Sequence, residues 1–357
     1  MGGNRSGRPQ QQTPSSATQS SVPPPSSTSS QPPRSSSSST QSSSVPPPSS
    51  TSSQPPRSSS SSTQSPPQPQ PQPVPPMILP LANVANTCYA VSTLQVLHSV
   101  DLQHQLLPGQ TPLQMNLTNL LSPILNISAA SPQTDLVNLV MALNMCLPPQ
   151  SQFHVGQQQC AGEFLGSLLD SLTLQPHFST FQVQAVCHVC RNTESSNLAN
   201  SVTPLLLIIP ILNSPVPADL SHLVTRILTQ QGNFLSCQTV NCPARLAPIP
   251  SNVIFTDQTV SVYWLSRNIS QGGRQIKSLT QVQDPGQTNW NGKQCTALLA
   301  HEGRVPGGGH WVAFLKASGV WWRVDSNRAG PNLENPFISQ MNPNNPYGYT
   351  IDILFFT

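Results

Sequence analysis

The sequence predicts an α+β domain that follows a long disordered tail. Residues 1–76 are nearly all Ser, Pro, Gln and Thr, whereas residues 77–357 contain the apolar residues from which a core can form. Within 77–357, apolar residues recur at helical spacing in the first half, and strand-like runs dominate the second half. Helices that precede a group of strands are typical of the α+β class.

The tail has a composition that excludes a packed core. Residues 1–76 contain no aromatic residue, so burial cannot offset the conformational entropy that ordering would cost. The segment Ser21–Ser42 recurs unchanged as Ser44–Ser65, with a period of 23 residues. We interpret this repeat as a duplicated linker. Its proline triplets could dock on a proline-reading domain, but a passive spacer is favoured.

Helices are expected where apolar residues repeat every three or four positions. The first begins at Cys88 and carries Val91, Leu94 and Leu97 on one side. The other expected helices contain Leu117–Leu121, Leu136–Leu143 and Gln159–Leu172.

Strands are expected where short runs are rich in β-branched and aromatic residues. These runs are Val253–Phe255, Val260–Leu265, Thr296–Ala300, Trp311–Leu315, Trp321–Asp325 and Tyr349–Phe356. A turn at Ala317–Gly319 would join two of them into a hairpin, which sets His310 beside Asp325.

Cys88 and this hairpin together carry the residue types of a nucleophilic site. At the start of a helix, unpaired backbone N–H groups and the positive end of the dipole favour a thiolate. A cysteine nucleophile needs a base, and the base needs a group that orients it. Cys88, His310 and Asp325 supply these three parts, although a small buried thiol is the alternative interpretation of Cys88.

Four blocks of sequence, in the correct order, resemble the ubiquitin-specific proteases, papain-like cysteine peptidases that cut ubiquitin from other proteins. The blocks are Asn83–Gln95, Gln158–Asp170, His301–Trp311 and Trp322–Asp325, and they span roughly 240 residues. The resemblance covers the chain from about Met77 to its C-terminus. It implies a papain-like α+β fold with a helical thumb, a β palm and zinc-tipped β fingers, with the catalytic cleft between thumb and palm.

The resemblance also implies roles for individual residues. Cys88 would be the nucleophile, His310 the general base and Asp325 the residue that orients the base. Asn83 would donate a hydrogen bond to the oxyanion, although an asparagine before a helix is also typical of a turn. The residues implied to line the channel for the modifier's C-terminal tail are Gln159, Cys160, Glu163, Gly309 and Trp311.

The chain departs from the family at three positions. Ala85 stands where the family normally has glycine, and Ser326 stands where it often has an acidic or amide residue, for which Asn327 could substitute. Cys160 replaces an aspartate. A neutral thiol cannot provide the charge-assisted hydrogen bond, worth roughly 1.5–3 kcal/mol, that a carboxylate offers to a basic tail. Either other contacts hold ubiquitin, or the substrate is a ubiquitin-like modifier with a different tail.

Two close pairs of cysteines predict a structural zinc site. Cys187 and Cys190 enclose two residues, and Cys237 and Cys242 enclose four. Two such pairs can surround one tetrahedral zinc ion, while disulfides or free thiols are the alternatives. The resemblance implies a similar four-cysteine site at the tips of the fingers. The remaining cysteines, Cys146, Cys160 and Cys295, are expected to be buried thiols.

Composition narrows the partners and the compartment. Residues 77–357 carry 11 basic and 12 acidic residues, so no nucleic-acid surface is expected. The longest apolar run, Leu205–Leu212, is interrupted by Pro210 and is too short to span a membrane. No signal peptide is apparent, which predicts an intracellular protein, in the cytoplasm or nucleus, where reducing conditions favour zinc over disulfides.

Two functions remain at this point. The first is a cysteine-type deubiquitinase, or ubiquitinyl hydrolase, that removes ubiquitin or a ubiquitin-like modifier from protein conjugates. The second is a non-catalytic module of the same fold that binds the modifier without cutting. The presence of Cys88, His310, Asp325 and Asn83 together favours the enzyme, because a binding module has no use for an aligned nucleophile, base and oxyanion donor.

Overall fold

The computed structural model describes residues 73–126, 132–197, 203–229, 233–285, 292–305, 308–332, 335–340 and 348–357. Residues 1–72, which hold most of the predicted disordered tail and its duplicated segment, lie outside the described residues. The disorder of the tail therefore stays a prediction.

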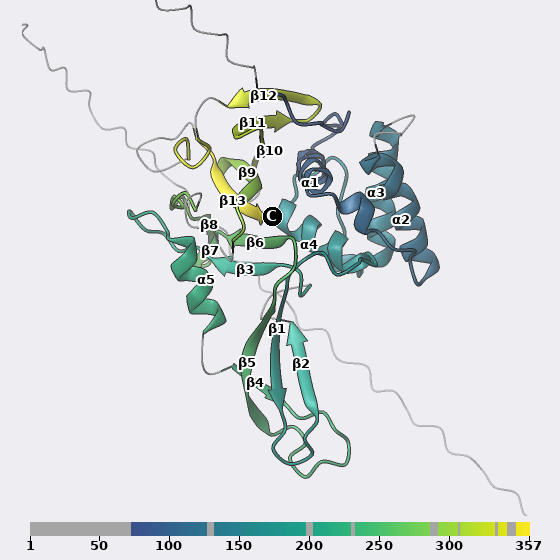
Figure 1. Ribbon diagram of the computed structural model, residues 1–357, viewed down its shortest axis with the longest axis vertical. Helices are drawn as coiled ribbons and strands as arrows, with labels where there is room; N and C mark the ends of the chain where they lie inside the picture. Colours follow the sequence, from purple (N-terminus) through teal and green to yellow (C-terminus); the bar gives the residue numbers. More distant parts are fainter. Residues whose placement is uncertain are drawn as a thin grey trace, which may run out of the picture. The chain divides into compact units, whose positions relative to one another are not determined.

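A group of helices, which we call the thumb, contains every helix that the sequence predicted (Figure 1). Its α2 begins with a capping box, in which the side chains of Thr111 and Gln114 each accept a hydrogen bond from the other residue's backbone N–H. Its α4 begins two residues after the predicted Gln159, because Cys160 has an extended backbone at the N-cap. The thumb helices are α1 (Cys88–Ser99), α2 (Pro112–Leu125), α3 (Pro132–Cys146) and α4 (Ala161–Ser171), with 3-10 turns at Leu102–Gln105 and Pro149–Ser151.

Helix α1 is enclosed on all sides, although polar residues lie between its apolar ones. Every residue from Cys88 to Leu97 is buried. The buried hydroxyl groups of Ser92 and Thr93 are satisfied within the helix: Ser92 Oγ donates to the Cys88 carbonyl at 2.7 Å, and Thr93 Oγ1 donates to the Tyr89 carbonyl at 2.7 Å. The helix therefore holds Cys88 inside the core rather than on the surface.

A seven-stranded sheet, which we call the palm, has the strand order β12-β11-β10-β9-β13-β6-β3 (Figure 1). Its neighbouring strands are antiparallel except for the parallel pair β3 and β6. The predicted hairpin is present as β10 and β11, and its turn residues Ser318 and Gly319 have φ of 50° and 77°. The strands are β3 (Leu207–Pro210), β6 (Ser261–Ser266), β9 (Cys295–Val305), β10 (Gly308–Ala317), β11 (Val320–Asp325), β12 (Arg328–Asn332) and β13 (Thr350–Phe356).

The palm is buried on both faces. In β10, Trp311 and Ala313 pack with the thumb in one core cluster, whereas Val312 and Phe314 pack in a second cluster on the opposite face. The second cluster includes α5 (Leu220–Leu228), a helix that the sequence analysis did not predict. Burial on both faces explains why β10 is a continuous apolar run rather than an alternating one.

A second sheet, which we call the fingers, has the strand order β2-β1-β5-β4 and is antiparallel throughout. The sequence predicted only Val253–Phe255 of this sheet, because strands such as Thr-Glu-Ser-Ser-Asn in β2 carry no apolar signal. A separate two-stranded hairpin, β7 (Asn268–Gln271) and β8 (Arg274–Lys277), was also missed. The finger strands are β1 (Thr180–Val186), β2 (Thr193–Asn197), β4 (Asn233–Ser236) and β5 (Pro248–Thr256).

These elements confirm the predicted α+β class, with most helices preceding most strands. Across the described ranges, no helix combines the length and the hydrophobicity that crossing a membrane requires.

Candidate active site

Cys88 is the first residue of α1, at the end of a tightly held loop. The hydroxyl of Thr87 accepts a hydrogen bond from the Val84 N–H at 3.1 Å and donates to the Val84 carbonyl at 2.8 Å. Ala85 and Asn86 both adopt left-handed backbone conformations, with φ of 48° and 62°. This conformation is unfavourable for alanine, by roughly 1–2 kcal/mol, and it explains why a glycine suits the position of Ala85.

The strained loop is fastened to a neighbouring segment at Gly156. The Gly156 N–H donates to the Ala85 carbonyl at 2.6 Å, and the Asn86 amide donates to the Gly156 carbonyl at 3.0 Å. These bonds stabilise the left-handed turn, so the start of α1 is fixed even though its loop is exposed.

The structure brings His310 and Asp325 together as the predicted hairpin requires. His310 Nε2 lies 2.9 Å from Asp325 Oδ1. A hydrogen bond with Cys88 raises the pKa of His310 to about 9 despite partial burial, and Asp325 contributes to the same shift. With Nε2–H donated to Asp325, Nδ1 is the ring nitrogen left to exchange a proton with the thiol.

Asp325 is held by neighbouring groups, of which the sequence analysis did not identify Arg323. Arg323 Nη2 lies 3.3 Å from Asp325 Oδ2 and also pairs with Glu302 Oε1 at 2.8 Å. The Ser326 hydroxyl donates to Asp325 Oδ1 at 3.4 Å, so this departure from the family pattern still supports the carboxylate. The Ser326 carbonyl in turn accepts a bond from Gln95 Nε2 of α1 at 2.9 Å.

Asn83 and Asp325 open onto one hollow. Asn83 is exposed, and its side chain can reach this space from the loop before α1. The hollow has a volume of about 680 Å³, and its lining includes Asn83, Arg323, Asp325, Ser326, Asn327 and Arg328.

The predicted channel residues come from two parts of the chain, one next to the thumb and one in the palm, which are joined by hydrogen bonds between side chains and backbone groups. Trp311 Nε1 donates to the Gln159 carbonyl at 3.0 Å. The Gly309 N–H donates to Gln158 Oε1 at 2.9 Å, and Gln158 Nε2 donates to the Gly309 carbonyl. Gln158 was not identified as a site residue, although it lies within the glutamine-rich block that carried the resemblance.

Gly309 cannot be replaced by a larger residue without displacement of its neighbours. Its φ is +145°, and a Cβ atom there would lie 2.1 Å from the Glu302 carbonyl oxygen and 2.7 Å from His301 Nε2. The close approach therefore requires glycine next to His310.

Cys160 presents a neutral thiol at the start of α4. Burial raises the pKa of Cys160 to about 12, with a smaller contribution from the nearby Glu163 carboxylate. Burial also raises the pKa of Glu163, which is the acidic residue in the first turn of α4. Cys160 therefore adds no negative charge at this end of the predicted channel.

The four predicted metal ligands converge at one end of the fingers and could hold a metal ion. The sulfur atoms of Cys187, Cys190, Cys237 and Cys242 all lie within 4.8 Å of one another. The pair Cys187 and Cys242 is separated by 3.8 Å, and the pair Cys190 and Cys237 by 3.7 Å. These distances match the edge of about 3.8 Å in a tetrahedron whose metal–sulfur bonds are about 2.3 Å long.

The three other cysteines differ from one another in burial. Cys295 is buried as predicted, but Cys146 and Cys160 are only half-buried. Both lie at helix ends, Cys146 as the last residue of α3 and Cys160 before α4, where packing is less complete.

Comparison of the sequence with protein-family models and with curated proteins finds no match. Among solved structures, the chain is similar to a SAGA DUB module, Ubp8/Sgf11/Sus1/Sgf73 with a Ubp8 variant, bound to monoubiquitin. That match has a TM-score of 0.50 and 16% identity, and it covers 80% of this chain and 71% of the other. A second structure of the SAGA DUB module, with a different Ubp8 variant, matches with a TM-score of 0.50, 17% identity and coverages of 78% and 68%. This similarity supports a fold like that of the ubiquitin-specific proteases.

Removal of the Asp325 charge is expected to lower the pKa of His310. In Asp325→Asn the pKa should fall from about 9 toward the ordinary 6.5, because one hydrogen bond and one charge that favour the imidazolium are lost. Since the folded-state pKa is raised, the stability gained from protonated His310 is complete below about pH 6.5 and disappears as the pH rises through about 9. NMR titration of histidine ring signals measures the shift.

The matched control for this titration is Asp101→Asn. It removes a carboxylate that pairs with a different histidine, His104. The titration of His310 should be unchanged in this control. An unchanged His310 titration in Asp325→Asn as well would contradict the arrangement described above.

Proposed function

We propose that this chain is a cysteine-dependent isopeptidase that removes ubiquitin or a ubiquitin-like modifier from protein conjugates. The observation that supports this most strongly is that His310 contacts both Cys88 and Asp325. These residues come from a buried helix and from two strands of the palm, and no core packing requires a histidine and a carboxylate there. The similarity in fold to ubiquitin-bound DUB structures supports ubiquitin or a relative of it as the modifier.

The proposed reaction has two halves. The Cys88 thiolate attacks the carbonyl carbon of the isopeptide bond, and His310 gives its proton to the departing lysine amine, which leaves a thioester. His310 then removes a proton from water, which attacks the thioester and releases the modifier's tail as a carboxylic acid. Asp325 holds the imidazole in the orientation that serves both steps.

The oxyanion formed in each half needs a donor, and Asn83 is the candidate. It lies on the loop before Cys88 and opens onto the same hollow as Asp325. One preorganised donor of this kind is worth about 3 kcal/mol of the barrier.

Zinc is the proposed occupant of the four-cysteine cluster. Cys187, Cys190, Cys237 and Cys242 form an all-sulfur set, which leaves no open position for water, so the ion would be structural. The small core around the cluster, with Ala185 and Ile249, is too small to order this end of the fingers without it.

The central test is labelling of Cys88. Ubiquitin and several ubiquitin-like proteins that carry thiol-reactive groups at their C-termini are incubated with the chain, and mass spectrometry identifies the modified cysteine. Cys88→Ala should abolish labelling and turnover, and His310→Ala should reduce both by at least about 10³-fold, because members of one catalytic unit are not additive.

Cys146→Ala is the control for this test, since it removes a half-buried thiol outside the site. Its labelling and turnover should equal those of the unmodified chain. Modifier binding without labelling or turnover in the unmodified chain would favour the non-catalytic module.

Metal analysis tests the zinc proposal. Reduced, freshly purified protein should contain about one zinc ion per chain. Cys190→Ser should lose the metal and expose the fingers to proteolysis, while the palm keeps its protection from hydrogen exchange. Cys295→Ser is the control and should keep the zinc ion. Finding no zinc in the unmodified protein would favour free thiols.

Substrate selection is tested at Cys160. In Cys160→Asp, a ubiquitin substrate should gain about tenfold in kcat/KM if roughly 1.4 kcal/mol of charge-assisted bonding is recovered in the transition state. The gain should shrink with added salt. If the native substrate has a less basic tail, the new carboxylate should instead reduce activity on that substrate.

Cys146→Asp makes the same chemical change outside the channel and should leave kcat/KM unchanged for every modifier. Unchanged kcat/KM for all modifiers in Cys160→Asp would show that Cys160 does not line the channel.

A further inference from the structure

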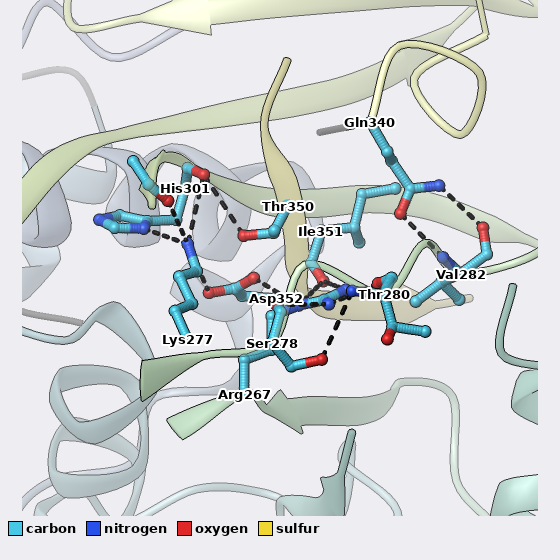
Figure 2. Close-up of polar contacts among 11 residues, drawn as sticks. Arg267, Lys277, Ser278, Thr280, Val282, His301, Gln340, Thr350, Ile351 and Asp352 are labelled. Atoms are coloured by element: carbon cyan, nitrogen blue, oxygen red, sulfur yellow. Dashed lines mark hydrogen bonds and ion pairs between the residues drawn. The ribbon is translucent and has the colours of Figure 1, made fainter. Parts of the chain in front are cut away.

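Three charged side chains lie buried close to one another (Figure 2), around a small cavity that Cys160 and Trp311 also line. Arg267 follows β6, Lys277 ends β8 and Asp352 belongs to β13, and each is at most 7% exposed. Burial of charged groups is costly unless they are paired and hydrogen-bonded. The contacts of each charged group indicate its structural role.

Arg267 is fully engaged as a structural brace. Its Nη1 donates to the Ser278 and Thr280 carbonyls at 3.2 and 2.6 Å, and its Nε and Nη2 donate to the Ile351 carbonyl at 3.1 and 2.8 Å. Its Nε also lies 2.9 Å from Asp352 Oδ1. All three guanidinium nitrogens have partners, so Arg267 is held in one position.

Lys277 is different, because its contacts are directed at one short stretch of β9. Its Nζ donates to the Gly303 carbonyl at 3.2 Å and to His301 Nδ1, and it lies 3.5 Å from the His301 carbonyl. Asp352 Oδ2 lies 3.9 Å behind the ammonium group. Figure 2 shows Lys277 between His301 and Asp352.

The stretch of β9 that Lys277 contacts is the pairing partner of the catalytic end of β10. His301 pairs with Trp311, and Glu302 pairs with His310, beside an irregularity in register between Gly308 and His310. Irregularities of this kind redirect side chains, and they are common next to active sites. The direction of the His310 side chain therefore depends on how this part of β9 is held.

His301 transmits the contact to the channel wall. Because Nδ1 accepts from Lys277, the ring is neutral and carries its proton on Nε2, and burial lowers the pKa of His301 to about 4. The His301 ring packs against Trp311 with a centroid distance of 4.6 Å. Its Nε2 also lies against Gly309, where no Cβ atom would fit.

We propose that Lys277, backed by Asp352, is a positioning residue that fixes the bulged start of β10 and thereby aims His310 at Cys88. This inference rests on the proposed function only for its kinetic consequence. Lys277 lines a small cavity together with Cys160 and Trp311. Its hydrogen bonds run to the carbonyls of β9 and to the ring of His301, and it acts through these groups.

Lys277→Met in the full chain tests this inference, since methionine fills similar space without donating hydrogen bonds. Amide hydrogen exchange in residues 301–311 should become faster, and the pKa of His310 should fall below about 9, because its bond with Cys88 is loosened. Turnover of a ubiquitin substrate should fall by about 10²-fold, mainly in kcat, as expected for a misplacement of about 1 Å.

Two further variants separate positioning from general stability. Lys293→Met removes a different lysine, which is partly buried and pairs with the carboxylate of Asp257, and it should change none of the three measurements. Lys277→Arg keeps a cationic hydrogen-bond donor, so the pKa of His310 should lie between its values in Lys277→Met and in the unmodified chain.

Unchanged exchange in 301–311 and an unchanged His310 titration in folded Lys277→Met would overturn the inference. If Lys277→Met does not fold, the same two measurements on Asp352→Asn decide, with smaller changes in the same direction expected. Neither measurement needs a substrate. A chain without isopeptidase activity would therefore refute the proposed function and leave this inference open to the same test.

Discussion

The candidate site depends on the bond between Gln95 and the turn that follows Asp325. Gln95 lies in the middle of α1 and is completely buried, and its Nε2 donates to the Ser326 carbonyl at 2.9 Å. The same side chain pairs with both backbone groups of Leu79, at 2.8 and 2.9 Å. One amide thus joins the helix that begins with Cys88, the segment that precedes it and the strand end that carries Asp325. Because a buried amide without partners is costly, these three parts are stable only together.

The sequence predicted those parts of the site whose partners lie close in the chain. The start of α1 follows from the spacing of Val91, Leu94 and Leu97, and the approach of His310 to Asp325 follows from a short hairpin. Long-range polar contacts could not be predicted in this way, since Gln95 and Ser326 are separated by 231 positions. Their individual residue types carry no signal for the contact, and only the fold creates it.

The fingers and the supporting charges were missed for a related reason. The strand Thr193–Asn197 has no apolar residue, and it forms because Gln182 to Val186 of β1 pair with it. Lys277 is likewise a residue that composition places on the surface, although the structure buries it. The convergence of the four cysteines was predictable because a cluster that could hold a metal ion is recognised from residue type and spacing, both of which are visible in a sequence.

Two residues before Cys88 with a left-handed backbone conformation limit which substitutions can stabilise this protein. Ala85 and Asn86 hold conformations that glycine would adopt at lower cost, and contacts with Gly156 maintain them. Local conflict between a residue and its backbone is often concentrated where function is located, while the rest of the chain is consistent with its fold. Substitutions that raise the thermal stability of the protein should therefore be found more easily in this loop than in the packed core. Each gain would relax the segment that holds Cys88, the proposed nucleophile, so stability and the proposed reactivity compete within the same few residues.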